Sequence, residues 1–181
     1  MPRKASAGRQ KMLTLLCKAR TFEKSTPLSN GDLMLTQLVQ EFTEMLDAAE
    51  KRLLQLDESQ ARKRPSGGKW SAQEILGHLI DSASNNHQRF VRLQIGTDTK
   101  FPSYEQSAWV RAQAYQSEPW LSLVRFWAQY NRHLLHVIAS LPGDRLGVLC
   151  SVGEGEPVTF EFLIRDYVRH LRHHLDQIAA L

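Results

Sequence analysis

Four segments with helical periodicity constrain the fold of this chain more than any other feature. Apolar residues recur at spacings of three and four through residues 30–56, 71–95, 119–141 and 159–180, the pattern of helices that each bury one face. Four helices of similar length can share one core by packing side by side. The pattern predicts an all-α domain built as a four-helix bundle.

The second predicted helix has the clearest boundaries. Ser71 and Glu74 have the spacing of a capping box, and Trp70 precedes them where a hydrophobic staple packs. Gly96 follows the last apolar position, as glycine often does at a helix C-terminus. These signals predict a helix that starts at Ser71 and runs to about Ile95.

The other boundaries rest on weaker signals. Ser29 or Asn30 is a suitable N-cap for the first helix, Pro119 suits the first turn of the third, and Thr159 suits the N-cap of the fourth. We expect a loop at 61–69, a short helix within 105–115 and an irregular stretch with a small hairpin at 144–158. We also expect three aromatic residues of the third helix, Trp120, Phe126 and Trp127, to be core residues.

The connection between the second and third helices is unusually long. Residues 97–118 separate the two segments, enough chain to return along the full length of the bundle. Such a crossover permits the second and third helices to run parallel, although the length alone does not require it.

The positive charge of the chain is concentrated at its N-terminus. Residues 1–24 carry seven Lys/Arg and one acidic residue, whereas the rest of the chain carries 16 Lys/Arg and 18 Asp/Glu. We therefore expect a basic, flexible extension at residues 1–28 and a mildly acidic domain at residues 29–181. A basic extension can touch nucleic acid, but the acidic domain makes nucleic acid an unfavoured partner.

Cysteine content and hydropathy indicate where the chain resides. Cys17 and Cys150 are its two cysteines, too few for a disulfide framework. No apolar run reaches the roughly 20 residues that cross a bilayer, and the N-terminus lacks the apolar segment of a secretory signal. The expectation is a cytoplasmic protein with no membrane partner.

Histidines are the main candidates for chemistry. His170 and His174 stand four residues apart on the fourth predicted helix, so their imidazoles share one face. Such a pair can supply two nitrogen ligands to a divalent ion, with zinc or nickel preferred. His173 points about 100° away from His174 and is expected to be a neighbour on the shoulder of the helix.

A third ligand must come from another helix, and His78 is the best candidate. It is flanked by apolar residues on the second predicted helix, which suits a buried ligand. An equally good interpretation is a core histidine bonded to the carboxylate of Glu74 or Asp81. His133 and His136 can compete for the ligand role, and His87 is expected at the surface.

Several linked motifs resemble one known family. The second predicted helix contains Trp70-Ser71-Ala72-x-Glu74-Ile75-x-Gly77-His78-Leu79, then Asp81-Ser82, and then Asn85-Asn86-x-x-Arg89-Phe90. Tyr104-x-Gln106-x-Ala108-Trp109 and His170-x-x-His173-His174-x-x-Gln177-Ile178 follow. Together they resemble the DinB/YfiT-like superfamily over roughly residues 30–181.

The resemblance implies a four-helix bundle with a crossover, often homodimeric, that holds a divalent metal through three histidines. Matched by motif position, these ligands are His78, His170 and His174. The family includes metal-dependent hydrolases and S-transferases that use low-molecular-weight thiols. The resemblance therefore implies a metal-dependent enzyme acting on a small molecule, with a non-catalytic metal-binding dimer, used for ligand sensing or assembly, as the alternative.

Five further residues are candidates for a supporting role. Asp81 and Asn85 follow His78 by three and seven residues and share its face. Asp166 precedes His170 by four and can accept a hydrogen bond from a ligand. Tyr104 and Trp109, on the crossover, can close over the metal. Solvated, capping or packing roles are equally open for all five.

Overall fold

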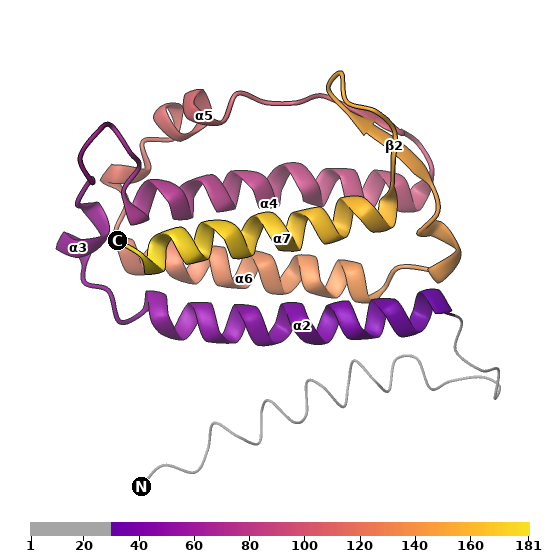
Figure 1. Ribbon diagram of the computed structural model, residues 1–181, viewed down its shortest axis with the longest axis horizontal. Helices are drawn as coiled ribbons and strands as arrows, with labels where there is room; N and C mark the ends of the chain where they lie inside the picture. The colour runs from indigo at the N-terminus through magenta and orange to yellow at the C-terminus, as the bar shows by residue number, and fades with distance from the viewer. Residues whose placement is uncertain (1–29) are drawn as a thin grey trace, which may run out of the picture.

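Four long helices form the body of the protein, seen in a computed structural model that describes residues 30–181 (Figure 1). The four are α2 (Asn30–Leu53), α4 (Ala72–Ile95), α6 (Trp120–Ala139) and α7 (Phe160–Ala179). Helix α4 packs against both α6 and α7, and α2 packs against α6. The all-α four-helix bundle predicted from the periodicity is confirmed.

Helices α4 and α6 run in the same direction, and α2 and α7 run opposite to them (Figure 1). The chain between α4 and α6 therefore returns along the outside of the bundle. This crossover contains β1 (Lys100–Phe101), α5 (Gln106–Ala112) and the short 3-10 helix η1 (Tyr115–Ser117). The connection that the sequence permitted is the one the fold adopts.

The boundaries of α4 are those predicted. The Ser71 hydroxyl accepts from the backbone N–H of Glu74, and the Glu74 carboxylate accepts from the backbone N–H of Ser71. Gly96 follows the helix with φ 74°, in the left-handed region that glycine adopts without strain. Thr159 caps α7 as predicted, by accepting from the backbone N–H of Phe162 at 3.1 Å.

Three details differ from the prediction. Helix α2 ends at Leu53 rather than near Leu56, and a short helix, α3 (Glu58–Arg62), follows with its own capping box at Asp57. Pro119 precedes α6 as its N-cap rather than lying in its first turn. Phe126 is 55% exposed while Trp120 and Trp127 are buried. The core assignment of Phe126 was wrong because it followed residue type, and its position on α6 faces outward.

A small sheet joins the crossover to the connection between α6 and α7. After η2 (Gly143–Arg145), β2 (Leu149–Val152) pairs antiparallel with β3 (Val158–Thr159), which is the predicted hairpin. Strand β2 also pairs parallel with β1 of the crossover, a pairing that no local pattern indicated.

The core lies between the four helices and leaves two histidines at its edge. The ring of Tyr167 meets that of Phe42 edge-on at 6.0 Å, and its hydroxyl donates to Asn131 Oδ1 at 2.6 Å. Along α7, Leu171 and Leu175 continue the buried stripe, and each such side chain contributes about 1.5–3 kcal/mol. His170 and His174 lie beside this stripe and are half-buried.

Residues 1–29 lie outside the described part of the chain. The predicted basic extension at 1–28, the candidate N-cap Ser29 and Cys17 all belong to that segment. Within residues 30–181, no helix is long and apolar enough to cross a membrane.

Candidate metal centre

Three histidines from two antiparallel helices converge at one point between α4 and α7. One nitrogen from each of His78, His170 and His174 lies within 4.8 Å of the others. The ring centroids of His78 lie 5.1 Å from His170 and 4.8 Å from His174. Among residues 30–181, this is the group of His, Cys, Asp and Glu side chains close enough together that they could hold a metal ion.

The spacing of these nitrogens suits a shared ion. His78 Nε2 and His170 Nε2 face each other at 3.1 Å. Two imidazole nitrogens bonded to one tetrahedral zinc ion at about 2.0–2.1 Å lie roughly 3.3 Å apart. The donor set therefore fits a divalent ion of the zinc or nickel class.

The surroundings of His78 do not match an ordinary core histidine. The side chain is completely buried, yet its Nδ1 has no hydrogen-bond partner in the described residues. The Glu74 carboxylate binds Arg64 and the helix cap, and Asp81 accepts from the crossover. Neither carboxylate bonds to His78, so the interpretation as a histidine held by Glu74 or Asp81 is wrong.

A glutamine on the last turn of α7 orients one of the candidate ligands. Gln177 Oε1 accepts from Nδ1 of His174 at 2.7 Å, which places the proton on Nδ1 and leaves the Nε2 lone pair for a metal. The amide of Gln177 also contacts His173 Nε2 at 3.0 Å. His173 therefore contacts the same glutamine that bonds to His174, a contact that its predicted shoulder position did not include.

The remaining contacts of the cluster come from α4 and from the residue before its N-cap. Ser82 Oγ lies 3.5 Å from His170 Nδ1, at the outer limit of a hydrogen bond. The ring of Trp70 packs on His78 with centroids 5.3 Å apart. Trp70 therefore covers one side of the ligand ring and reduces its contact with water.

Burial keeps the histidines in the form that binds metal. Desolvation, followed by repulsion from His170 and His174, lowers the pKa of His78 to about 3. Desolvation and His174 lower the pKa of His170 to about 4, although the Asp166 carboxylate opposes the shift. Desolvation also lowers the pKa of His174. All three imidazoles are therefore neutral at neutral pH, with lone pairs free for a cation.

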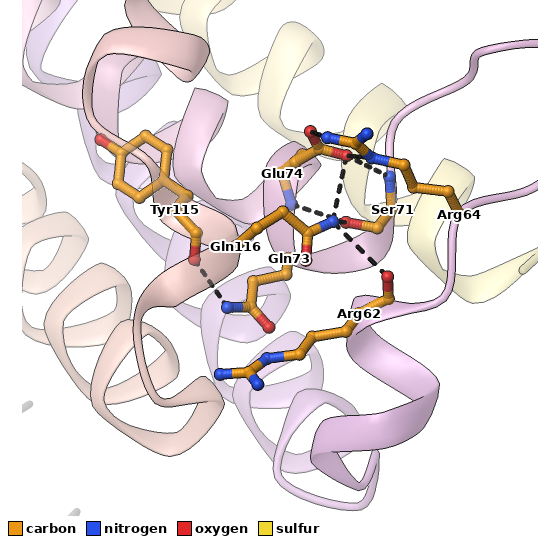
Figure 2. A network of polar contacts seen from close by, with 7 residues as sticks. All are labelled: Arg62, Arg64, Ser71, Gln73, Glu74, Tyr115 and Gln116. Atoms are coloured by element: carbon orange, nitrogen blue, oxygen red, sulfur yellow. Dashed lines mark hydrogen bonds and ion pairs between the residues drawn. The ribbon is translucent and has the colours of Figure 1, made fainter.

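A polar network fixes the N-terminal turn of α4, one turn before His78 (Figure 2). Arg64 from the preceding loop donates two hydrogen bonds to the Glu74 carboxylate. Gln116 of η1 donates to Ser71 Oγ at 2.6 Å and to Glu74 Oε2 at 3.2 Å. Gln73 donates to the backbone oxygen of Tyr115 at 2.6 Å. Loop, helix and crossover are thus joined where α4 begins.

The crossover also packs directly onto the α4 backbone beside His78. A Cβ added at Gly77 would lie 2.1 Å from the Tyr115 ring, so glycine permits a contact that any other residue would block. The Tyr115 hydroxyl donates to Asp81 Oδ1 at 2.7 Å. Asp81 therefore faces the crossover, and its described bonds are with crossover residues rather than with the histidines.

The other predicted supporting residues lie outside direct contact with the cluster. Asn85 donates to the backbone oxygen of Asp81 at 2.9 Å, within the same helix. Asp166 pairs with Arg169 on α7, and it reaches His170 only through its charge. Tyr104 and Trp109 pack on each other with centroids 4.9 Å apart. The structure brings together the three histidines and does not bring these residues to them.

The competing histidines form a separate, more open group. His87 on α4 contacts the Tyr130 hydroxyl at 3.2 Å, and its ring centroid lies 5.0 Å from that of His133. The rings of His133 and His136 are 6.4 Å apart, and both residues are exposed. His87 is half-buried rather than fully at the surface.

Sequence reasoning missed the contacts of Gln177, Trp70 and Ser82 with the histidines. A spacing signal was present for Gln177, which follows His174 by three and His173 by four, the distances that bring side chains together on a helix. Ser82 lies four residues after His78 and therefore on the same side of α4. The contact between Trp70 and His78 depends on the turn before α4, which spacing alone does not describe.

Comparisons with known proteins identify the family and the fold. The family model of the DinB superfamily matches residues 41–178. YfiT from Bacillus subtilis, described as a probable metal-dependent hydrolase with an unusual four-helix bundle topology, has a similar structure with a TM-score of 0.71 and 18% identity. The match covers 88% of this chain and 90% of YfiT.

A variant of a mycothiol-dependent maleylpyruvate isomerase is also similar, with a TM-score of 0.67 and 11% identity. That match covers 80% of this chain and 60% of the isomerase. No curated protein sequence matches with significance. At these identities the solved structures establish the shared fold, and the family model extends over most of the chain. The chain belongs to the DinB superfamily.

Proposed function

We propose that this protein is a metal-dependent enzyme that uses His78, His170 and His174 to hold one divalent ion, zinc or nickel, and acts on a small molecule. The observation that carries the proposal is the convergence of three neutral imidazoles from two helices, with the buried Nδ1 of His78 left without a hydrogen-bond partner among the described residues. Three protein ligands leave a coordination position open, as in catalytic rather than structural zinc sites.

A divalent ion at this site would act as a Lewis acid, acidifying water for hydrolysis or a thiol for S-transfer. The chain itself supplies orientation and shielding. Gln177 keeps the proton of His174 on Nδ1, and Trp70 shields the ring of His78. Cys150 is not a suitable nucleophile, because it is buried and burial raises the pKa of its thiol.

YfiT, described as a probable metal-dependent hydrolase, supports hydrolysis, and the mycothiol-dependent isomerase supports the use of a thiol. The resemblance also supports a low-molecular-weight thiol as co-substrate and a homodimer as the assembled state. Light scattering of the full chain tests the dimer, with a mass of one chain as the contradicting result.

The activity test uses protein loaded with zinc or nickel and assayed against two panels. One panel combines small thiols with carbon electrophiles, and the other contains esters and amides without thiol. Activity in either panel that disappears in His174→Ala and after chelation supports the enzyme. Metal binding without turnover in both panels would instead favour the non-catalytic metal-binding bundle.

A further inference from the structure

A depression lies between α4, α6 and the crossover, apart from the three histidines. Its volume is about 530 Å³, and its lining comes from α4, from α6 and from the crossover at α5 and the residue after it. Tyr130 and Ile80 form part of its wall, together with the exposed aromatics Trp109 and Phe126. None of the three candidate metal ligands contributes to it.

One oxygen of a buried carboxylate in this wall lacks a hydrogen-bond donor among the described residues. Asp81 is 1% exposed, and its Oδ1 accepts from the Tyr115 hydroxyl and from the Gln113 amide. Its Oδ2 is buried with no partner among the described residues, and Asp81 forms no ion pair within residues 30–181. Burial raises the pKa of this carboxyl, since no cation compensates for its desolvation. One oxygen of this buried carboxylate can therefore accept a further hydrogen bond.

Three aromatic side chains line the depression beside this carboxylate, namely Trp109, Phe126 and Tyr130. Phe126 and Tyr130 stack one turn apart on α6, with centroids 5.7 Å apart and rings inclined by 9°. Trp109 faces the same depression from α5. Aromatic faces attract ammonium ions, and the attraction increases when water is excluded. A carboxylate and three aromatic rings around one hollow suit an organic cation better than a neutral or anionic ligand.

Gln113 covers the carboxylate from the solvent side. Its side chain is exposed, yet its amide donates to buried Asp81. An amide is a neutral donor, whereas an ammonium group adds the attraction of opposite charges to its hydrogen bond with a carboxylate. An ammonium group can therefore replace this amide once the Gln113 side chain rotates away.

We propose that this depression binds a small organic amine, with its ammonium group on Asp81 and its apolar body against Trp109, Phe126 and Tyr130. The site is separate from the histidine cluster and does not depend on the proposed metal. An aryl-alkyl amine is the ligand class that fits both the carboxylate and the aromatic wall.

Titration calorimetry with phenethylamine tests the proposal, using phenethyl alcohol as the uncharged ligand of the same shape. The amine should bind the full-length protein about tenfold more tightly than the alcohol. Asp81→Asn should abolish that preference, and Trp109→Ala should weaken both ligands. Gln113→Ala should strengthen amine binding, because the competing amide is gone.

Two controls separate this result from folding and from metal binding. Asp47 of α2 pairs with Arg132 of α6, away from the depression. Asp47→Asn therefore removes a carboxylate outside the proposed site, and the preference for amine over alcohol should remain. His78→Ala should bind amine as the wild type does, whether or not metal is lost. Equal affinity for amine and alcohol in the wild type would overturn the proposal. So would an unchanged amine affinity in Asp81→Asn that retains the wild-type circular dichroism spectrum.

Discussion

The two histidine groups on either side of α4 contain nearly the same side chains and differ in what surrounds them. Each combines one histidine of α4 with two from a neighbouring helix. On the α7 side, His78 and His170 bring their Nε2 atoms to 3.1 Å. On the α6 side, His87 bonds to Tyr130, and the rings of His133 and His136 lie 6.4 Å apart.

Burial and spacing account for this difference. His170 and His174, four residues apart, border the buried stripe of α7 and face α4, whereas His133 and His136, three apart, lie on the exposed side of α6. Buried imidazoles without carboxylate partners retain unsatisfied lone pairs, and exposed ones are satisfied by water. Composition alone does not make a metal site, because convergence within a desolvated space is also required.

The largest expected effect separates the two groups directly. His78→Ala should lower zinc affinity more than about 100-fold, because changing an outer partner alone costs 10–100-fold. Elemental analysis after reloading and desalting should find about one metal per wild-type chain and almost none in the variant. His133→Ala is the matched control and should keep its metal. If His78→Ala keeps its metal, or if His133→Ala loses its metal, the metal does not bind at the first group.

A second substitution tests how tightly the crossover packs against α4 beside the first group. Gly77→Ala would place a methyl group against the buried Tyr115 ring, at a cost of about 1–3 kcal/mol in the free energy of unfolding. Alanine otherwise stabilises a helix interior relative to glycine by about 1 kcal/mol. Urea denaturation measures whether the free energy of unfolding falls or rises. A rise would show that the Tyr115 ring moves aside at little cost.

The outer partner of His174 supplies a finer test. Gln177→Leu removes the acceptor at Nδ1 and should reduce metal affinity by about 10–100-fold while leaving one metal per chain at saturation. Gln129→Leu, on the exposed side of α6, is the matched control and should keep the wild-type metal affinity. Competition titration against a chromophoric chelator measures the metal affinity of both variants. Equal affinities in both variants would mean that Gln177 does not orient His174.

Acidification should affect the metal-free protein through the first group. The folded-state pKa values of His78 and His170, about 3 and about 4, lie below the ordinary value of 6.5. The unfolded chain therefore takes up protons first, and the stabilising contribution present above pH 6.5 is lost progressively as pH falls toward these values.

Chemical denaturation of chelator-treated protein from pH 7 to pH 4 should show this decline, by roughly 1 kcal/mol or more. His78→Phe should flatten the decline, because phenylalanine fills the volume without taking up a proton. If the free energy of unfolding of the wild type stays constant over this pH range, the pKa values of the buried histidines are not lowered as described.

Much of the fold could be predicted from local signals. The capping box at Ser71, the glycine at position 96 and the cap at Thr159 are each decided by a few neighbouring residues, and all three were predicted correctly. Helix α3 was missed because its five residues carry no apolar period. Phe126 was misassigned because an aromatic residue fits either a core or an exposed binding surface.

The sequence by itself determined which residues can serve as metal ligands, because the spacing of His170 and His174 fixes their shared face whatever packs against it. The sequence also named His78 as the best third partner but left open a core histidine held by Glu74 or Asp81. Tertiary structure removed that alternative, because both carboxylates bond to other donors. Pairing of β1 with β2 and the contact of Tyr115 with Gly77 also join residues distant in sequence. Periodicity reports the faces of single helices, whereas these contacts depend on how the helices and the crossover pack together.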